Sequence, residues 1–150
     1  MTHRIHATTT QRLNMAPDAV FDAWLDPVKV RIWLAAALQV AGLPGDIRQV
    51  QIEPHVGGSY LFSDFRNGME ARHWGRYLEL ERPHRLVFTW IVDESEAANP
   101  SKVTIDIQPD GDECIATITH EMDAAWIEFV SKTEQGWARM LTAIGVTQHW

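Results

Sequence analysis

Side chains able to bind a metal or act as nucleophiles are few and scattered in this sequence. None of the seven histidines forms a pair at the helical i, i+4 spacing, and Cys114 is the only cysteine. A zinc site gathers several His or Cys ligands, and a serine hydrolase carries a Gly-x-Ser-x-Gly turn, which does not occur here. No glycine-rich phosphate loop is present either. The sequence therefore predicts no catalytic residue, no metal site and no cofactor.

Two of the reactive side chains fall on one predicted strand. Cys114, Ala116, Ile118 and His120 alternate with polar or β-branched residues, so they share one face. On that apolar face Cys114 is expected to be a buried structural thiol. His120 is either a hydrogen-bonded core histidine or a polar anchor for a bound molecule.

A second polar candidate is Arg76, which has the same strand parity as Trp74, Leu78 and Leu80. If that face is concave, Arg76 is a buried cation that needs a partner such as Glu53, Asp64 or a ligand carboxylate. If the face is convex, Arg76 belongs to the ordinary surface. The sequence leaves both placements open.

Aromatic residues are the most unusual feature, with seven tryptophans in 150 residues. Wide apolar walls occur in a ligand cavity, in an interface such as that of a homodimer, or in a bulky core. We expect a single cavity that holds a small hydrophobic molecule, while some tryptophans serve as plain core. The side chains predicted to line it are Trp24, Trp33, Tyr60, Phe62, Trp74, Arg76, Phe88, Trp90, His120, Trp137 and Met140.

The elements that would position these side chains can be read along the chain. A Thr-rich strand is expected over 5–13, followed by a helix that starts near Pro17. Asp26-Pro27 ends that helix and starts a second, shorter one, with Val28, Ile32 and Trp33 as its apolar stripe. A β-meander runs from the Gly57-Gly58 pair to Trp90, and the pair permits a sharp bend or close backbone approach.

The C-terminal part of the chain supplies a hairpin and a long helix. Alternating residues on both sides of 109–112 indicate two strands joined by a tight turn. Residues 123–145 are predicted to form one amphipathic helix. Its apolar stripe contains Trp126, Val130, Trp137, Met140, Leu141 and Ile144.

This order of one strand, two short helices, about six strands and a long helix predicts an α+β fold. An antiparallel sheet with one apolar face must cover that face, and the long terminal helix is the obvious cover. No interdomain linker or repeat is visible, so residues 1–150 are expected to form a single domain.

Charge and hydropathy exclude some classes of partner. The formal net charge is −7, which argues against binding to nucleic acid or to an anionic membrane. No apolar run approaches membrane-spanning length, and the first residues show no signal-peptide core. A cytoplasmic protein is the resulting expectation.

Ordered motifs along nearly the whole chain resemble the family of activator of heat-shock protein 90 ATPase homologues, within the START-like superfamily of the birch-pollen allergen and the polyketide cyclases. The first helix and its flank match, as do several strand segments and the Gly-Trp pair of the last helix. The matching segments are 16–24 with Asp26-Pro27 and Trp33, then 57–60, 75–79, 83–90, 103–105, 117–120 and 136–137.

The resemblance implies a helix-grip fold, in which a curved antiparallel sheet wraps around the C-terminal helix. It further implies a binding module for a hydrophobic or aromatic molecule between sheet and helix. Two other functions stay open. One is a cofactor-free cyclase- or lyase-type enzyme using the same cavity, with His120, Arg76 or Asp64 as acid or base. The other is a domain that contacts a chaperone.

Overall fold

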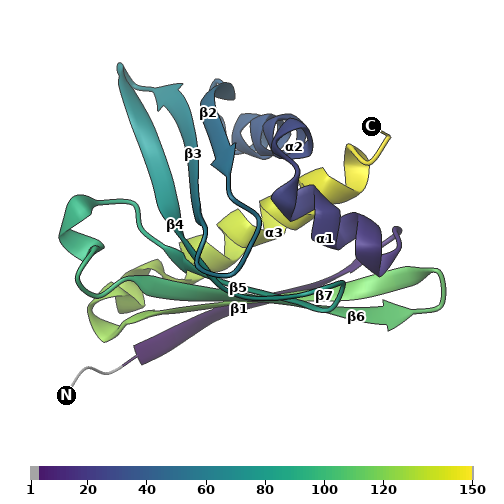
Figure 1. Cartoon of the computed structure of the whole chain (residues 1–150). Helices are drawn as coiled ribbons and strands as arrows, with labels where there is room; N and C mark the ends of the chain where they lie inside the picture. Colours follow the sequence, from purple (N-terminus) through teal and green to yellow (C-terminus); the bar gives the residue numbers. More distant parts are fainter. Residues whose placement is uncertain (1–3, 150) are drawn as a thin grey trace.

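The structure, a computed structural model, describes residues 4–149 (Figure 1). One strand is followed by two helices, six further strands and a C-terminal helix, with two short 3₁₀ helices, η1 and η2, in the second half. The elements are β1 (Arg4–Leu13), α1 (Pro17–Leu25), α2 (Pro27–Val40), β2 (Asp46–Ile52), β3 (Ser59–Arg66), β4 (Met69–Glu81), β5 (Arg85–Trp90), η1 (Glu94–Glu96), β6 (Ser101–Asp110), β7 (Glu113–Asp123), η2 (Ala124–Phe129) and α3 (Val130–Val146).

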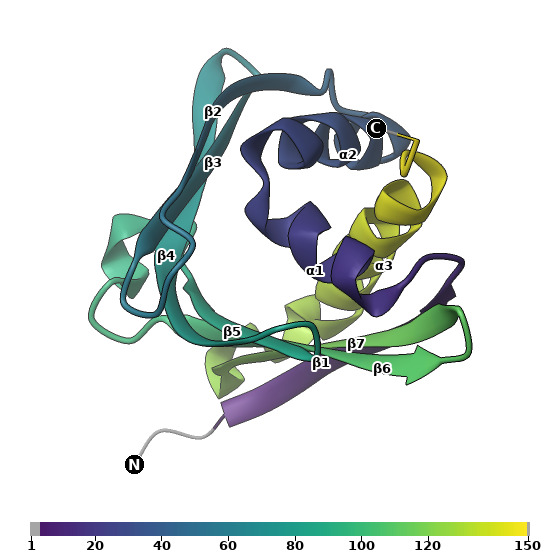
Figure 2. The same ribbon diagram turned by 45° about the vertical axis from the view of Figure 1, so that its right-hand side comes forward.

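All seven strands form one antiparallel sheet in the order β1-β7-β6-β5-β4-β3-β2. The sheet curls, and its inner side faces α1, α2 and α3 (Figure 2). The predicted α+β class, the curved antiparallel sheet and the position of two helices after the first strand are therefore confirmed.

Close backbone contacts accompany the curl between β3, β4 and β5. A Cβ atom on Gly75 would lie 2.0 Å from the Thr89 carbonyl oxygen, and one on Gly58 would lie 2.2 Å from that of Glu53. The β4–β5 register also shifts between Tyr77 and Glu79, which is a bulge that bends the strand. The close backbone approach expected at the Gly57-Gly58 pair is thus found at Gly58.

The core lies between the inner face of the sheet and the helices. Helix α3 buries Trp137, Leu141, Ala143 and Ile144. From the sheet, alternate residues of β6 and β7 belong to the same core and are almost fully buried; they are Val103, Ile105, Ile107, Cys114, Ala116 and Ile118. Cys114 is therefore buried as expected, and burial raises the pKa of its thiol.

The predicted terminal helix is wrong at its start. Residues 124–129 form the 3₁₀ helix η2, and the α-helix begins only at Val130. Asp123 starts the 3₁₀ turn by accepting a hydrogen bond from the Ala125 amide at 2.8 Å, but Trp126 has non-helical backbone angles. Because of this kink Trp126 leaves the stripe that α3 buries, and it is 43% exposed.

The second helix also differs from its prediction. With 14 residues α2 is longer than α1, which has nine, and Val28 and Ile32 are exposed. Asp26 caps the helix through the Val28 amide, which puts Val28 in its first turn. The buried row starts two residues after Val28 and follows the i, i+3, i+4, i+7 spacing. Its members are Val30, Trp33, Leu34 and Ala37.

None of the helices within residues 4–149 is long and apolar enough to cross a lipid bilayer.

Candidate functional site

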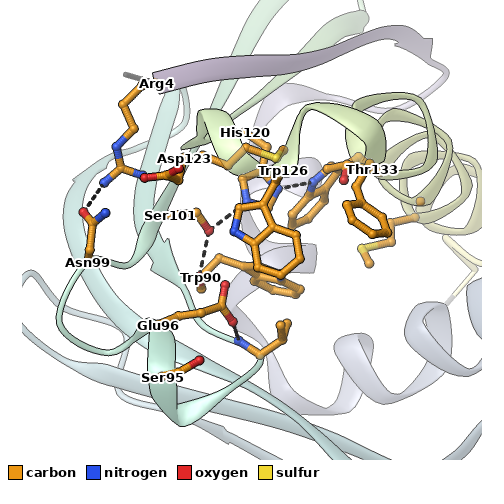
Figure 3. A pocket seen from close by; sticks show the side chains of 16 residues that line it. Arg4, Trp90, Ser95, Glu96, Asn99, Ser101, His120, Asp123, Trp126 and Thr133 are labelled. Atoms are coloured by element: carbon orange, nitrogen blue, oxygen red, sulfur yellow. Dashed lines mark hydrogen bonds between the residues drawn. The ribbon is translucent and has the colours of Figure 1, made fainter. Parts of the chain in front are cut away.

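A pocket of about 520 Å³ opens between the ends of β5, β6 and β7 and the segment formed by η2 and α3 (Figure 3). We call it the large pocket. Its walls combine rings and methionines with a few polar side chains. The lining residues are Arg4, Trp90, Val92, Ser95, Glu96, Asn99, Ser101, His120, Met122, Asp123, Trp126, Phe129, Thr133, Gly136, Trp137 and Met140.

Aromatic rings from three parts of the chain form the apolar walls of the large pocket. The Trp90 ring from β5 lies 4.9 Å from the Trp137 ring of α3, measured between centroids. On the other side the rings of Trp126 and Phe129 lie 5.5 Å apart on η2. The exposure of Trp126 that follows from the kink in η2 thus gives the pocket one of its walls.

A chain of hydrogen bonds crosses the inner wall of the pocket (Figure 3). The Trp137 indole Nε1–H donates to His120 Nδ1 at 3.0 Å. Because an indole nitrogen can only donate, Nδ1 of the neutral ring must accept, and the ring proton sits on Nε2. Nε2 therefore donates to Ser101 Oγ at 2.8 Å, and Ser101 donates to the Trp90 carbonyl oxygen at 2.8 Å.

The direction of these hydrogen bonds limits the role that His120 can have in catalysis. A general base would accept a proton from the Ser101 hydroxyl, but here His120 donates to that oxygen and its other nitrogen is occupied by Trp137. Burial also lowers the pKa of His120 to about 4, so the ring is neutral near pH 7. His120 is both a hydrogen-bonded buried histidine and a pocket residue, so its two predicted roles coexist.

Buried histidines lead to a prediction for the pH dependence of stability. Burial is the largest cause that lowers the pKa values of His120 and His73 to about 4 from the ordinary 6.5. The folded-state pKa of each histidine lies below its unfolded-state pKa of 6.5. Each neutral histidine therefore makes its full contribution to folding stability above pH 6.5. As the pH falls toward 4, the unfolded chain takes up protons that the folded chain does not. Each histidine should then remove on the order of 3 kcal/mol of stability.

The measurement is urea unfolding of the wild type and of His120→Gln between about pH 7.5 and about pH 4.5. Carboxylates titrate in both proteins, so the difference between the two curves isolates His120. We expect the free energy of unfolding to fall less steeply with acidification in the variant. Parallel curves would show that the protonation of His120 does not change the free energy of unfolding.

The rim of the large pocket holds Arg4 from β1. Its Nη2 donates to Asn99 Oδ1 at 2.7 Å (Figure 3). The same nitrogen donates to the Pro100 carbonyl oxygen at 3.1 Å. Its Nη1 is buried and has no hydrogen-bond partner among residues 4–149. Glu96 on the same rim accepts from the Val92 and Asp93 amides, so it caps η1.

These rim residues were missed by sequence reasoning. Arg4 and Asn99 are 95 positions apart and meet because β1 pairs with β7, the partner of β6. No motif or spacing in the sequence connects them. Phe129 could have been included from its aromatic type, but the helical stripe predicted for 123–145 did not contain it.

A second pocket, of about 190 Å³, lies between α2, the β3–β4 hairpin and the other side of α3. We call it the small pocket. Three predicted cavity residues, Trp24, Trp33 and Phe62, border this pocket rather than the large one. The lining residues are Trp24, Trp33, Leu34, Ala37, Leu38, Ala41, Leu43, Phe62, Arg66, His73, Trp90, Gly136, Arg139 and Met140.

The predicted cavity residues therefore divide into four groups, of which those bordering the small pocket alone are named above. Trp90 and Met140 border both pockets, whereas His120 and Trp137 border the large one only. Tyr60 and Phe88 border neither; they are packed in the core with ring centroids 5.6 Å apart. The phenol hydroxyl of Tyr60 donates to the Thr89 carbonyl oxygen.

The expected inclusion of Trp74 and Arg76 in the cavity is corrected by the structure. Both lie on the outer face of β4, because their neighbours Gly75 and Tyr77 are the buried residues of that stretch. Arg76 is exposed and donates from Nη1 to the Gly57 carbonyl oxygen at 3.1 Å. The bulge after Tyr77 shifts the parity of β4, so Leu80 turns to the core while Trp74 stays outside.

Within residues 4–149 no three His, Cys, Asp or Glu side chains gather in a group that could hold a metal ion. Asp64 is buried, and it forms a two-point ion pair with Arg66 at 2.6 and 2.7 Å. The carboxylate considered as an acid or base is thus occupied by a neighbouring guanidinium.

Comparison with solved structures supports the description of the fold. The chain is similar to protein CV1439 from Chromobacterium violaceum, with 22% identity, a TM-score of 0.79 and 97% coverage of both chains. It is also similar to PFC0360w from Plasmodium falciparum, named as an HSP90 activator, with 17% identity, a TM-score of 0.68 and 95% coverage of both chains. CalU16 from Micromonospora echinospora matches with 19% identity and a TM-score of 0.66, over 99% of this chain and 87% of its own.

At these identities the likeness shows a shared fold and no more. No curated protein sequence matches the chain. Residues 14–147 match the family described as activator of Hsp90 ATPase homolog 1-like protein, which is most of the sequence and agrees with the resemblance seen in its motifs. The chain therefore belongs to the activator of Hsp90 ATPase homolog 1-like protein family.

Proposed function

We propose that this protein is a binding module for a small hydrophobic or aromatic molecule, held between the sheet and α3. The observation that carries the proposal is the large pocket, whose walls are formed by the rings of Trp90, Trp126, Phe129 and Trp137. Its volume of about 520 Å³ lies within the ~300–1,000 Å³ that small-molecule sites usually have.

The state of the polar groups in the pocket supports binding rather than catalysis. His120 and Ser101 use their hydrogen-bonding atoms on Trp137, on each other and on the Trp90 carbonyl group. Glu96 holds two backbone amides. A bound molecule would meet these groups as fixed dipoles and would be contacted mainly by rings and methionines.

Binding can be tested with the apolar fluorophore N-phenyl-1-naphthylamine. We expect its emission to rise on addition of the protein and tryptophan emission to be quenched, because Trp90 and Trp137 line the pocket. Thr133→Phe places a ring in the pocket and should weaken binding by about tenfold or more. Ser131→Phe is the matched control, since Ser131 lies exposed on the same helix outside the pocket.

Absence of dye binding to the wild type would contradict the proposal. Equal binding to both variants would show that the dye does not occupy the large pocket.

A second candidate function is contact with a chaperone. It is favoured by the exposed apolar surface of η2, where Trp126, Ile127 and Phe129 are 43%, 60% and 44% exposed. The name of the Plasmodium neighbour gives this surface a candidate partner, a chaperone of the Hsp90 class. Ile127 does not line the large pocket, so Ile127→Asp separates the two functions. Chaperone binding measured by calorimetry should be lost in this variant, while dye binding should persist.

A further inference from the structure

Gly136 has an unusual position in the middle of α3. It borders both the large and the small pocket. A Cβ atom built on it would meet no heavy atom within 4 Å, so no packing contact requires a glycine here. Glycine weakens a helix interior relative to alanine, so its presence without a close neighbour calls for another explanation. The missing side chain leaves open space on the helix face that both pockets share.

Only a few side chains stand between the two pockets. Both linings contain Trp90, Gly136 and Met140, and the last two are one turn apart on the same side of α3. Methionine is unbranched and changes rotamer easily, so Met140 can adapt to a molecule passing beside it. The two pockets therefore adjoin across the bare backbone at Gly136.

The polar groups of the two pockets differ in charge. Arg66 and Arg139 line the small pocket, and its lining contains no carboxylate. Arg66 is neutralised by Asp64, whereas Arg139 has no hydrogen bond or ion pair within the part of the chain that the structure describes. The large pocket, in contrast, is bordered by the two carboxylates of Glu96 and Asp123 and by a single cation.

A buried donor adds to the small pocket. Trp24 is 3% exposed, and its indole Nε1 has no hydrogen-bond partner among residues 4–149. Trp24 borders the small pocket together with Arg139. Two residues with unpaired donors, Trp24 and Arg139, thus border the same small pocket, and such donors favour an anionic oxygen nearby.

We propose that the two pockets form one elongated site that crosses α3 at Gly136 and takes a single-chain amphipathic carboxylate. The hydrocarbon part lies in the large pocket among the aromatic walls, and the carboxylate lies in the small pocket beside Arg139. This inference rests on the proposed binding function and adds to it the length and the charge of the bound molecule.

The length of the site is tested by displacement of N-phenyl-1-naphthylamine with straight-chain alkanoic acids of increasing length. In the wild type, affinity should rise about fourfold for each added methylene until both pockets are filled. In Gly136→Leu the new side chain closes the junction, so the rise should stop at a shorter chain. In Gly136→Ala affinity should stop increasing at an intermediate chain length, because alanine fills less of the junction than leucine.

Thermal unfolding is the check that these variants remain folded. Gly136→Ala and Gly145→Ala exchange the same residue in the same helix, and Gly145 lines neither pocket. A Cβ atom at Gly145 would lie 3.5 Å from Leu13 Cδ2, which is an ordinary contact. We expect both alanine variants to raise the melting temperature, and only the one at Gly136 to change the chain-length profile.

The charge of the bound group is tested by comparing each acid with the alcohol of equal length. Arg139→Gln should weaken acid binding by about tenfold or more and leave alcohol binding nearly unchanged. Arg4→Gln is the control, because it removes a cation at the far rim of the large pocket.

The outcomes separate this inference from the function on which it rests. If the dye and all acids fail to bind the wild type, both proposals are wrong. If the dye binds but the profile ends at the same length in wild type and Gly136→Leu, only the elongated site is wrong. A loss of acid binding in Arg4→Gln instead of Arg139→Gln would overturn the placement of the carboxylate.

Discussion

Removal of residues 124–150 is expected to leave a chain that does not fold. Helix α3 contributes Trp137, Leu141 and Ile144 to the core, at 3%, 0% and 0% exposure. Loss of each such side chain costs about 2–5 kcal/mol, and their sum reaches the ~5–15 kcal/mol that typically stabilises a whole domain. The inner face of β1 and β7, on which α3 packs, would then lose its cover. Circular dichroism during heating should show no cooperative transition.

A chain ending at Thr147 is the matched control for this truncation. It keeps the whole of α3, whose last residue is Val146, and should unfold cooperatively at nearly the wild-type temperature. A cooperative transition in the chain that ends at Asp123 would show that the sheet is stable without its helix, contrary to the packing described above.

The second large effect is expected for Trp137→Ala. Trp137 is 3% exposed, contacts the Trp90 ring and donates the hydrogen bond that holds His120. If the ring acts as packed core, its removal should lower the free energy of unfolding by roughly 3–5 kcal/mol. If it mainly borders an open pocket, the loss should be smaller, and dye affinity should change greatly. Urea unfolding and dye titration on the same variant distinguish the two.

Trp137→Phe separates the ring from its N–H group. Phenylalanine keeps most of the apolar wall but leaves His120 Nδ1 without its donor, which should cost about 1–3 kcal/mol. Dye binding should then be closer to wild type than in Trp137→Ala. Unchanged dye binding in Trp137→Ala, together with a large loss of stability, would assign Trp137 to the core and remove it from the proposed site.

Much of the fold could be predicted from the sequence because its local patterns agree with the final structure. The alternation around Cys114 and His120 placed both on the inner face of β7, where they are found. The tight turn at 109–112 and the order of strands and helices were predicted for the same reason. A strand pattern with period two and a helix stripe are local features, and burial of one face enforces them.

The candidate site was only partly predictable. Trp90, His120, Trp137 and Met140 do meet in the large pocket, since each lies on the inner side of its own element. The division into two pockets was not foreseen, because it depends on how Trp90 of β5 packs beside Gly136 and Met140 of α3, the residues that both pockets share. Side-chain packing between distant elements leaves no periodic trace in the sequence.

By itself the sequence determined the class of fold, the inner faces of β6 and β7 and the aromatic character of the pocket walls. Three features were decided by the tertiary structure alone: the outward position of Trp74, the start of α3 at Val130 and the arrival of Arg4 at the pocket rim. A bulge, a kinked turn and the pairing of β1 with β7 produce them. The pairing of β1 with β7 joins segments far apart in the chain, whereas the bulge and the kink are local departures from regular strand and helix geometry. Neither kind of feature is encoded in the parity and periodicity from which elements are predicted.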